Sequence, residues 1–247
     1  MKDKPKFSAS SIRGEDCGYV AYHAPRYAFL LQLLAEYGVT ASTTLLDIGP
    51  SRLTTLIHEG FGVRVDSMGF GPDHLADGAR HFEFDLNFAQ DETHWRKDLP
   101  RYEFVVMAEV LEHLYTAPLL VLAFVKTLLV ENGLLILQTP NAASLPKRLK
   151  LLLGRNPYEM LRIDRSNPGH FREYTISELR RLAEETGFCV ERCMTRFYFD
   201  ARFARHDVGH VEPQPVVGWV KNSLYRCLPK GWREGITMVW RKPGMAS

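Results

Sequence analysis

The sequence has few cysteines and no long apolar run, and both absences narrow the class of protein. The four cysteines among 247 residues are scattered and form no CxxC pair, so neither a disulfide framework nor a cysteine-based metal site is indicated. The longest apolar stretch, residues 117–130, contains Lys126 and is shorter than the roughly 18–20 residues of a membrane-spanning helix. The basic start of the chain is not followed by an apolar run, so we expect no secretory signal and a cytoplasmic location.

Net charge is also nearly absent. The 31 Lys and Arg residues are almost balanced by 29 Asp and Glu, which gives a formal charge of +2. The chain as a whole therefore lacks the basic field that attracts nucleic acid. Hydrophobic residues make up 45% and charged residues 24%, proportions that are ordinary for a folded globular protein. We expect a packed protein whose partners do not include nucleic acid.

Helical and strand-like segments alternate along the chain, which is typical of a mostly parallel sheet covered by helices. Helices are predicted over residues 25–37, 51–59 and 116–131, with further helices after Thr175 and near residues 216–228. Strands are predicted over residues 43–48, 62–66, 80–86, 102–107, 133–139, 188–199 and 235–241. The pattern predicts an α/β protein with a doubly wound, Rossmann-like sheet of seven strands, helices on both faces and an antiparallel last strand.

We expect a single domain over residues 1–247, because a chain of this length can bury one large core. Residues 1–40 would form a helical cap at the N-terminal end of that domain. Residues 142–174 and 201–234 break the alternation of helices and strands, so we interpret them as inserted segments on the side of the binding site where an acceptor would lie. The sequence leaves the oligomeric state open.

Carboxylates recur at the ends of consecutive predicted strands. Asp47, Asp66 and Asp85 are spaced nineteen residues apart, and Glu109 follows the fourth strand. Because ligands of open parallel sheets bind beyond the carboxyl ends of the strands, these side chains are candidates for one site. Gly49 would allow a ligand to approach the backbone closely, and a carboxylate about twenty residues further on suits a ribose diol.

The first of these loops does not suit a dinucleotide. Its sequence, GPSRLT, has one glycine where a pyrophosphate site has the pattern GxGxxG, and the neighbouring carboxylates would repel phosphate. A cationic ligand that carries a ribose but no phosphate suits such a pocket better. S-adenosylmethionine, with its adenosine, sulfonium and amino-acid tail, has these properties. We therefore expect it as the cofactor, and we expect no metal ion.

Four motifs then carry a resemblance to a known family. The segments LLDIGPS, VDSMG, FDLN and MAEVLEHL, in this order and spacing, resemble the motifs of class I S-adenosylmethionine-dependent methyltransferases over roughly residues 25–200. The closest branch is that of small-molecule O-methyltransferases, which includes enzymes of the ubiquinone pathway. EVLEHL is the most specific motif, whereas Ser51 stands where the family usually has a second glycine. GHFREYTISEL also resembles branch members that modify glycans or lipid-linked sugars.

The resemblance implies a role in cofactor binding for each residue at the strand ends. Asp47 would orient the first loop, whose backbone would hold the methionine tail. Asp66 would bind the ribose hydroxyls, Met68 would contact the adenine, and Asp85 would accept from the adenine amino group. The full set implied for the cofactor is Asp47, Gly49, Pro50, Ser51, Asp66, Ser67, Met68, Asp85, Leu86, Ala108 and Glu109, of which the last two would face the sulfonium.

Two histidines are candidates for a catalytic base. Removal of a proton from a hydroxyl acceptor is assisted by a group with a pKa near 7, which histidine supplies. His113 lies in EVLEHL, and His170 would act from a segment that folds over the cofactor. The alternative is that His113 only caps or packs the start of a helix. Tyr22, His23 and Arg26 would contact the site if the first helix closes over it.

These inferences predict methyl transfer from S-adenosylmethionine to a hydroxyl of a small molecule or of a glycan-like or lipid-linked acceptor. An NAD-dependent oxidoreductase and a non-catalytic S-adenosylmethionine-binding protein are the alternatives. An RNA methyltransferase is disfavoured by the near-neutral charge.

Positive charge is concentrated in two segments that bear on the acceptor. Residues 145–172 carry seven Lys or Arg against two acidic residues, and residues 201–247 carry eight against three. Both segments mix these charges with Leu, Val or Trp, as helices at membrane surfaces do. They are either ordinary solvated faces or the binding surface of an anionic acceptor, with peripheral contact to a membrane.

Overall fold

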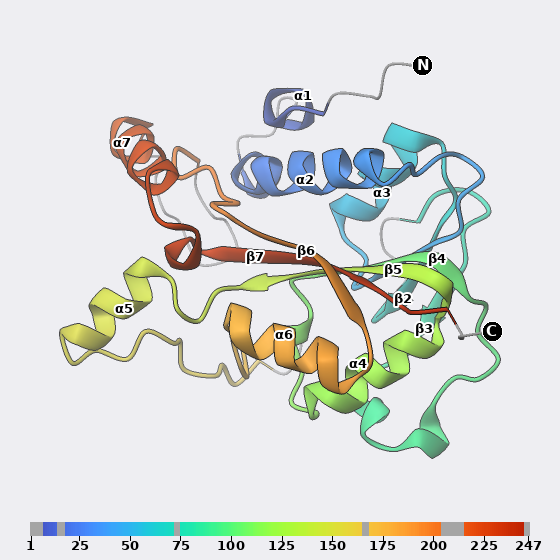
Figure 1. The fold of residues 1–247 in the computed structure, drawn as a ribbon. Coiled ribbons are helices and arrows are strands. Elements are labelled where there is room, and N and C mark those ends of the chain that lie inside the picture. Colours follow the sequence, from blue (N-terminus) through green and yellow to red (C-terminus); the bar gives the residue numbers. More distant parts are fainter. Residues whose placement is uncertain (1–6, 14–17, 72–74, 165–167, 204–214, 245–247) are drawn as a thin grey trace.

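The computed structural model describes residues 7–13, 18–71, 75–164, 168–203 and 215–244. It contains one seven-stranded sheet in the order β3-β2-β1-β4-β5-β7-β6 (Figure 1). The strands from β1 to β5 pair in parallel, and β7 is antiparallel to both of its neighbours. The strands are β1 (Leu45–Ile48), β2 (Val65–Gly69), β3 (His81–Glu83), β4 (Tyr102–Ala108), β5 (Leu129–Pro140), β6 (Cys189–Arg196) and β7 (Gly235–Arg241). The predicted fold class is confirmed.

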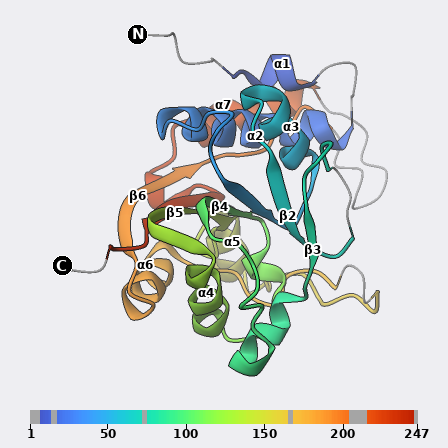
Figure 2. The same cartoon turned by 90° about the vertical axis from the view of Figure 1, so that its right-hand side faces the viewer.

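Helices cover both faces of this sheet. α1, α2 and α3 lie on one face, and α4 and α6 lie on the other (Figure 1, Figure 2). α5 and α7 project beyond the end of the sheet that carries the carboxyl ends of the parallel strands (Figure 1). The bounds are α1 (Ala9–Arg13), α2 (Tyr19–Glu36), α3 (Arg52–Phe61), α4 (Pro118–Thr127), α5 (Leu145–Leu152), α6 (Ile176–Glu185) and α7 (Pro215–Arg226). None of the described helices is long and apolar enough to cross a bilayer.

Each face of the sheet has its own hydrophobic core. On one side α2 buries Tyr27, Leu30 and Leu34 against strand residues such as Val239. On the other side α4 contributes Val121, Leu122, Phe124 and Val125, which belong to the same cluster as Trp240 of β7. These four are the buried residues of the ten-residue helix α4, which packs against β5 and α6. The two cores hold the sheet rigid, so the loops at its carboxyl edge start from fixed points.

Several element boundaries differ from those predicted. α2 begins at Tyr19, so Pro25 lies inside the helix instead of at its start. α4 ends at Thr127 and β5 begins at Leu129, because the pair Asn132-Gly133 makes an irregularity inside the strand rather than a helix stop. Asn132 has φ 63°, and the pairing of β4 with β5 shifts register at this point. A turn-forming pair therefore does not distinguish a chain reversal from a bulge in a strand.

The two segments expected to be insertions contain α5 and α7. Residues 142–174 include α5, and Tyr174 at the end of this segment pairs with Asn141. Residues 201–234 include α7 and the short helix η5 (Lys230–Trp232). Both segments start or end where β5, β6 and β7 meet the carboxyl edge, because Pro140 and Arg196 each pair with Gly235.

Candidate active site

The loop after β1 comes into close contact with the end of β2. Gly49 has φ 78°, and a Cβ atom at this position would lie 2.6 Å from Cγ2 of Val110. A Cβ atom on Gly69 would lie 3.3 Å from Cδ of Pro50, and the Gly49 amide donates to the Met68 carbonyl at 2.8 Å. The absence of side chains at Gly49 and Gly69 thus lets the loop after β1, the end of β2 and Val110 pack closely at the carboxyl edge.

A buried polar chain holds this loop in place. Asp47, only 1% exposed, accepts a hydrogen bond from Oγ1 of Thr54 at 2.6 Å. Thr54 in turn accepts from the Ser51 amide, and Ser51 caps α3. Burial raises the pKa of Asp47 to about 7. The expected orienting role of Asp47 agrees with this geometry, and Ser51 replaces the usual glycine because it serves as the helix cap.

The structure corrects the prediction that β2 ends at Asp66. The strand continues through Gly69, so Asp66 is its second residue and lies toward the opposite edge of the sheet. Its carboxylate is 2% exposed and accepts from the Arg80 guanidinium at 2.6 Å and from the hydroxyl of Tyr102, the first residue of β4, at 2.9 Å. The carboxylate thus already has two partners within the fold, and its expected bond to a ribose remains a prediction.

The next two residues of β2 are also interior. Ser67 is fully buried, and its Oγ lies 2.8 Å from Nδ1 of His81. The side chain of Met68 is fully buried in the core on the side of α4, and its expected contact with the adenine remains a prediction. The strand end that faces the crevice is Gly69, followed by Phe70, which is 74% exposed. Residues 72–74, which come next, lie outside the described residues.

Asp85 does lie at the predicted edge. It follows β3 and caps η1 (Leu86–Gln90), with Oδ1 accepting from the amide of Asn87 at 2.9 Å. Asn87 also accepts from the Tyr115 amide at 2.9 Å, which ties the loop after β3 to the loop after β4. Leu86 places its side chain in the core and its backbone beside the crevice, so the expected adenine contact of Asp85 and Leu86 remains a prediction that the geometry permits.

The residue after β4 has an unusual backbone. Glu109 has φ 60°, which is rare for a residue with a side chain, and its amide donates to the Gln138 carbonyl at 2.8 Å. Its carboxylate lies 3.9 Å from the guanidinium of Arg26, which is 5% exposed on α2. Burial lowers the pKa of Arg26, but Glu109 and the neighbouring tyrosines raise it, so the ion pair is retained. Ala108 and Glu109 are thus held at the carboxyl end of β4, and their expected contact with the sulfonium remains a prediction.

Tyr22 and His23 of α2 do not join Arg26 at Glu109. The ring of Tyr22 stacks on that of Phe199 at 5.0 Å, and the ring of His23 meets Phe199 edge-on at 5.1 Å. The amide of Asp200 also donates to the Tyr22 carbonyl at 2.8 Å. The start of α2 is therefore fixed to the segment after β6, and Arg26 of the same helix pairs with Glu109 at the end of β4.

Glu112 is a buried acid behind the same loop. It is fully buried, and Oε2 accepts from the hydroxyl of Thr139 at 2.9 Å. Within the described residues Oε1 has no hydrogen-bond partner. Burial, and then the charge of Glu109, raise the pKa of Glu112 well above its ordinary range, which favours a protonated carboxyl. Its carbonyl accepts from the Phe171 amide at 2.8 Å, so Glu112 also anchors the returning segment.

His113 and His170, predicted as alternatives, are adjacent. Their ring centroids are 4.7 Å apart in an edge-on arrangement. Nδ1 of His113 lies 3.0 Å from the Gly169 carbonyl, and Nδ1 of His170 lies 3.1 Å from Oε1 of Glu173. Because both of these oxygens only accept, each Nδ1 carries the proton and each Nε2 carries the lone pair in the neutral ring. Both imidazoles are therefore held in the tautomer that can accept a proton at Nε2.

Sequence reasoning did not identify Glu173 or Lys147 as parts of this cluster. Glu173 forms an ion pair with Lys147 of α5 and also holds His170. Burial lowers the pKa of Lys147 to about 8. The spacing of three residues between His170 and Glu173 was the only available signal, and it is too common to indicate a pair. Donor atoms of Glu112, His113 and His170 lie within 4.8 Å of one another, a set that a divalent cation could also bridge.

Comparison with known proteins points to one family. A family model described as a methyltransferase domain matches residues 20–192, more than two thirds of the chain. No curated protein sequence matches the chain. Among solved structures, an S-adenosylmethionine-dependent methyltransferase from Archaeoglobus fulgidus is 16% identical, with a TM-score of 0.52, 87% of this chain and 94% of that chain covered.

Two further solved structures share the fold. Magnesium protoporphyrin IX methyltransferase from Synechocystis, with bound S-adenosylhomocysteine, is 13% identical with a TM-score of 0.51, covering 88% of this chain and 82% of that chain. The [4+2]-cyclase SpnF is 15% identical with a TM-score of 0.56, and the match covers 90% of this chain and 82% of that chain. At these identities the likeness shows the fold alone, and the cyclase shows that the fold does not fix the reaction.

Proposed function

Since this chain belongs to the methyltransferase-domain family and uses S-adenosylmethionine as its cofactor, we propose that it transfers the methyl group to a hydroxyl of its acceptor. The observation that carries this proposal is the pair of adjacent histidines, His113 and His170, at the carboxyl edge of the sheet. His113 follows the loop of Glu109 in the chain. When bound, the cofactor supplies a methyl group on a positively charged sulfur. The backbone of the loop at Gly49 would bind its amino-acid tail, and the carboxylates of Asp85 and Glu109 would attract its charge.

His170 has the better geometry for the base. The carboxylate of Glu173 holds its Nδ1–H and would stabilise the imidazolium that forms when Nε2 accepts the proton of the acceptor hydroxyl. His113, held by a backbone carbonyl, would position the ring of His170 and the acceptor. Proximity would supply much of the remaining reduction of the activation barrier. Holding the acceptor oxygen in line with the methyl carbon and the sulfur can lower a barrier by about 7–11 kcal/mol.

Replacement of His170 tests this role. The full chain would be incubated with labelled S-adenosylmethionine and pools of phenols, sugar nucleotides and lipid-linked sugars, with products identified by mass spectrometry. We expect His170→Ala to slow turnover about 10²–10⁴-fold, the usual contribution of a general base. Its affinity for S-adenosylhomocysteine should be unchanged. His94→Ala, which alters a histidine that is 61% exposed, is the matched control and should keep full activity.

Four outcomes would count against the proposal. A product methylated on nitrogen or carbon would contradict the hydroxyl acceptor, and undiminished turnover of His170→Ala would remove the base. Loss of activity with a chelator, restored by a divalent cation, would instead indicate that Glu112, His113 and His170 hold a metal. Cofactor binding without any methylated product would support the non-catalytic alternative. An NAD-dependent oxidoreductase gains no support, since the first loop keeps its single glycine.

We also propose that the acceptor is reached at an anionic membrane surface. Fourteen of the twenty large hydrophobic side chains that are exposed among the described residues lie in residues 149–163 and 216–232. Leu152 is 82% exposed and Ile163 is fully exposed. Both segments are rich in Lys and Arg, so a second copy of the chain would meet like charge, whereas anionic lipid would be attracted.

Flotation with liposomes tests this surface. The protein should float with vesicles that contain phosphatidylglycerol at low salt, and the double variant Leu152→Ser/Ile163→Ser should stay at the bottom. Phe88→Ser, which removes a 51% exposed ring elsewhere, should float like the unaltered chain. Failure of the unaltered chain to float at low salt would contradict membrane contact without affecting the proposal for methyl transfer.

A further inference from the structure

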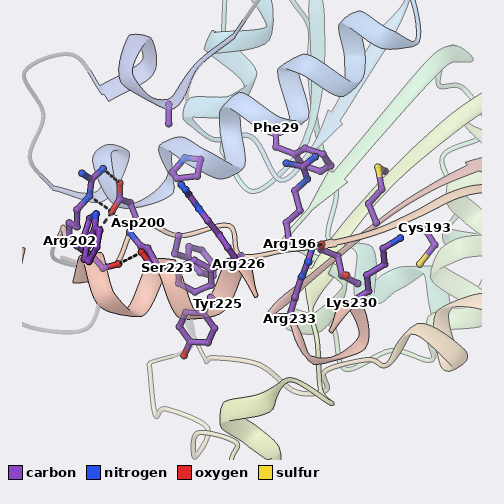
Figure 3. A pocket seen from close by; sticks show the side chains of 18 residues that line it. Phe29, Cys193, Arg196, Asp200, Arg202, Ser223, Tyr225, Arg226, Lys230 and Arg233 are labelled. Carbon is purple, nitrogen blue, oxygen red and sulfur yellow. Dashed lines mark hydrogen bonds and ion pairs between the residues drawn. The ribbon is translucent and has the colours of Figure 1, made fainter. Parts of the chain in front are cut away.

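A large cavity lies on the acceptor side of the sheet, apart from the loops at Gly49 and Gly69. It has a volume of about 720 Å³ and is enclosed by α2, the end of β6, the segment after β6, α7 and η5 (Figure 3). Aromatic rings line part of its wall, including Phe29 of α2, Phe197 and Tyr225. The rings of Phe197 and Tyr225 stack at 4.4 Å, so this wall is built from packed side chains.

The charge of this cavity is strongly one-sided. Among the described residues its lining includes five cations, Arg196, Arg202, Arg226, Lys230 and Arg233, and one carboxylate, that of Asp200. Asp200 is already bonded to Arg202, at 2.7 Å. Among the described residues no carboxylate pairs with Arg196, Arg226 or Lys230. Like charges in a shared cavity repel one another, so the arrangement favours an anion that neutralises them.

The cations approach the cavity from different elements. Arg226, the last residue of α7, extends toward α2, and Arg196, the last residue of β6, lies against the ring of Phe29 at 4.4 Å from its centroid (Figure 3). Arg233 is held by the carbonyls of Leu228 and Thr195 at 3.1 and 3.2 Å. A site with cations fixed on a strand, a helix and a short helix can surround a multiply charged group from several directions.

We propose that this cavity binds a phosphate or pyrophosphate group of the acceptor. The inference rests on the proposed function, because it gives the acceptor an anionic end that lies away from the methylated hydroxyl. β5 and β7 separate β6 from β4, so at strand spacings of about 4.8 Å the cavity lies about 14 Å along the sheet from the loop of Glu109. The acceptor would therefore be extended, with a pyrophosphate at one end and a sugar or similar hydroxyl-bearing group at the other.

Calorimetric titration with inorganic pyrophosphate tests the site directly. The full chain should bind pyrophosphate at low ionic strength, and the affinity should fall as salt is added. The double variant Arg226→Gln/Lys230→Gln should bind it at least about 10-fold more weakly, because two of the unpaired cations are lost. The double variant Lys97→Gln/Arg101→Gln, which removes two exposed charges beside the start of β4, is the matched control and should bind like the unaltered chain.

The outcomes separate this inference from the function on which it rests. Absence of pyrophosphate binding, or an equal loss in the control variant, would overturn the cavity as the anion site. S-adenosylhomocysteine titrated into the same samples reports on the cofactor crevice, and its binding should be the same in all three proteins. If pyrophosphate binds but labelled methyl appears on no acceptor, the cavity is retained and the proposed reaction fails.

Competition then identifies the source of the pyrophosphate. Displacement of bound pyrophosphate by a soluble nucleoside diphosphate sugar would indicate a nucleotide-activated acceptor. Displacement by a detergent-dispersed polyprenyl pyrophosphate would indicate a lipid-linked one, in agreement with membrane contact through residues 149–163 and 216–232. Either result supports the cavity, and failure of both to compete would contradict its assignment to the acceptor.

Discussion

The two ends of the sheet differ in how much apolar surface and unpaired positive charge they leave exposed. Around β1 to β4, hereafter the donor half, a buried polar chain runs from Asp47 through Thr54 to Ser51, although Oε1 of Glu112 has no hydrogen-bond partner among the described residues. Around β5 to β7, the acceptor half, α5 and α7 expose leucine, valine and tryptophan side chains, and a cavity collects unpaired cations. The acceptor half therefore has more apolar and basic surface that a ligand or partner would cover.

This difference explains where each kind of information lies in the sequence. A cofactor held by the backbone needs glycines and caps at fixed places, so the donor half carries short motifs. An acceptor held by exposed side chains needs charge and apolar area, which many arrangements supply. The acceptor half therefore shows composition rather than motif, as in the basic segments 145–172 and 201–247.

The largest expected effect comes from replacing one glycine by alanine in each half. Both glycines have a similar positive φ, so the added methyl group strains the backbone equally in the two variants. Gly49→Ala places a Cβ 2.6 Å from Val110 at φ 78°, so the first loop must shift. We expect affinity for S-adenosylhomocysteine, measured by calorimetry, to fall about 100-fold, roughly 2.7 kcal/mol. Gly154→Ala has φ 69° with no neighbouring atom within 4 Å, so it should cost only about 1–2 kcal/mol of stability and leave affinity intact. Equal losses in both variants would remove the distinction between the halves.

A smaller effect distinguishes two carboxylates of the donor half. Asp85→Ala should weaken binding of S-adenosylhomocysteine by about 1–2 kcal/mol, the scale of a lost hydrogen bond to a charged group. Asp66→Ala should instead lower the free energy of unfolding by about 2–4 kcal/mol, because Arg80 and Tyr102 lose their shared acceptor. Urea unfolding and calorimetry of both variants separate these effects. Weakened binding in folded Asp66→Ala would support its predicted contact with the ribose.

The smallest expected effect is a pH dependence confined to the donor half. Burial raises the pKa of Asp47 to about 7 in the folded state, above its ordinary value of 3.8. Between about pH 4 and 7 the folded state therefore binds more protons than the unfolded one, so stability falls as pH rises. Asp47→Asn removes this contribution. The free energy of unfolding of Asp47→Asn in urea, relative to that of the unaltered chain, should rise by about 1–2 kcal/mol from pH 5 to pH 8. An unchanged difference would show that Asp47 is ionised throughout.

The sequence was sufficient for the fold and for part of the site. Strand number, parallel pairing and the loop around Gly49 follow from patterns that are local in the chain. The end of β2 could not be predicted in this way. The residues after Asp66 are small or apolar, and the pattern contains no sign of where pairing with β3 stops. The neighbourhood of His113 and His170 was equally inaccessible, since it depends on a returning segment anchored to the backbone of Glu112.

The position of β7 also has a consequence for the order of assembly. This strand is inserted between β5 and β6, although it follows both in the chain. Until residues 235–241 have left the ribosome, β5 has an open edge and β6 has no neighbour with which to pair. The first four strands can meet their neighbours during synthesis, while the cavity beside β6 can close only after nearly the whole chain has emerged.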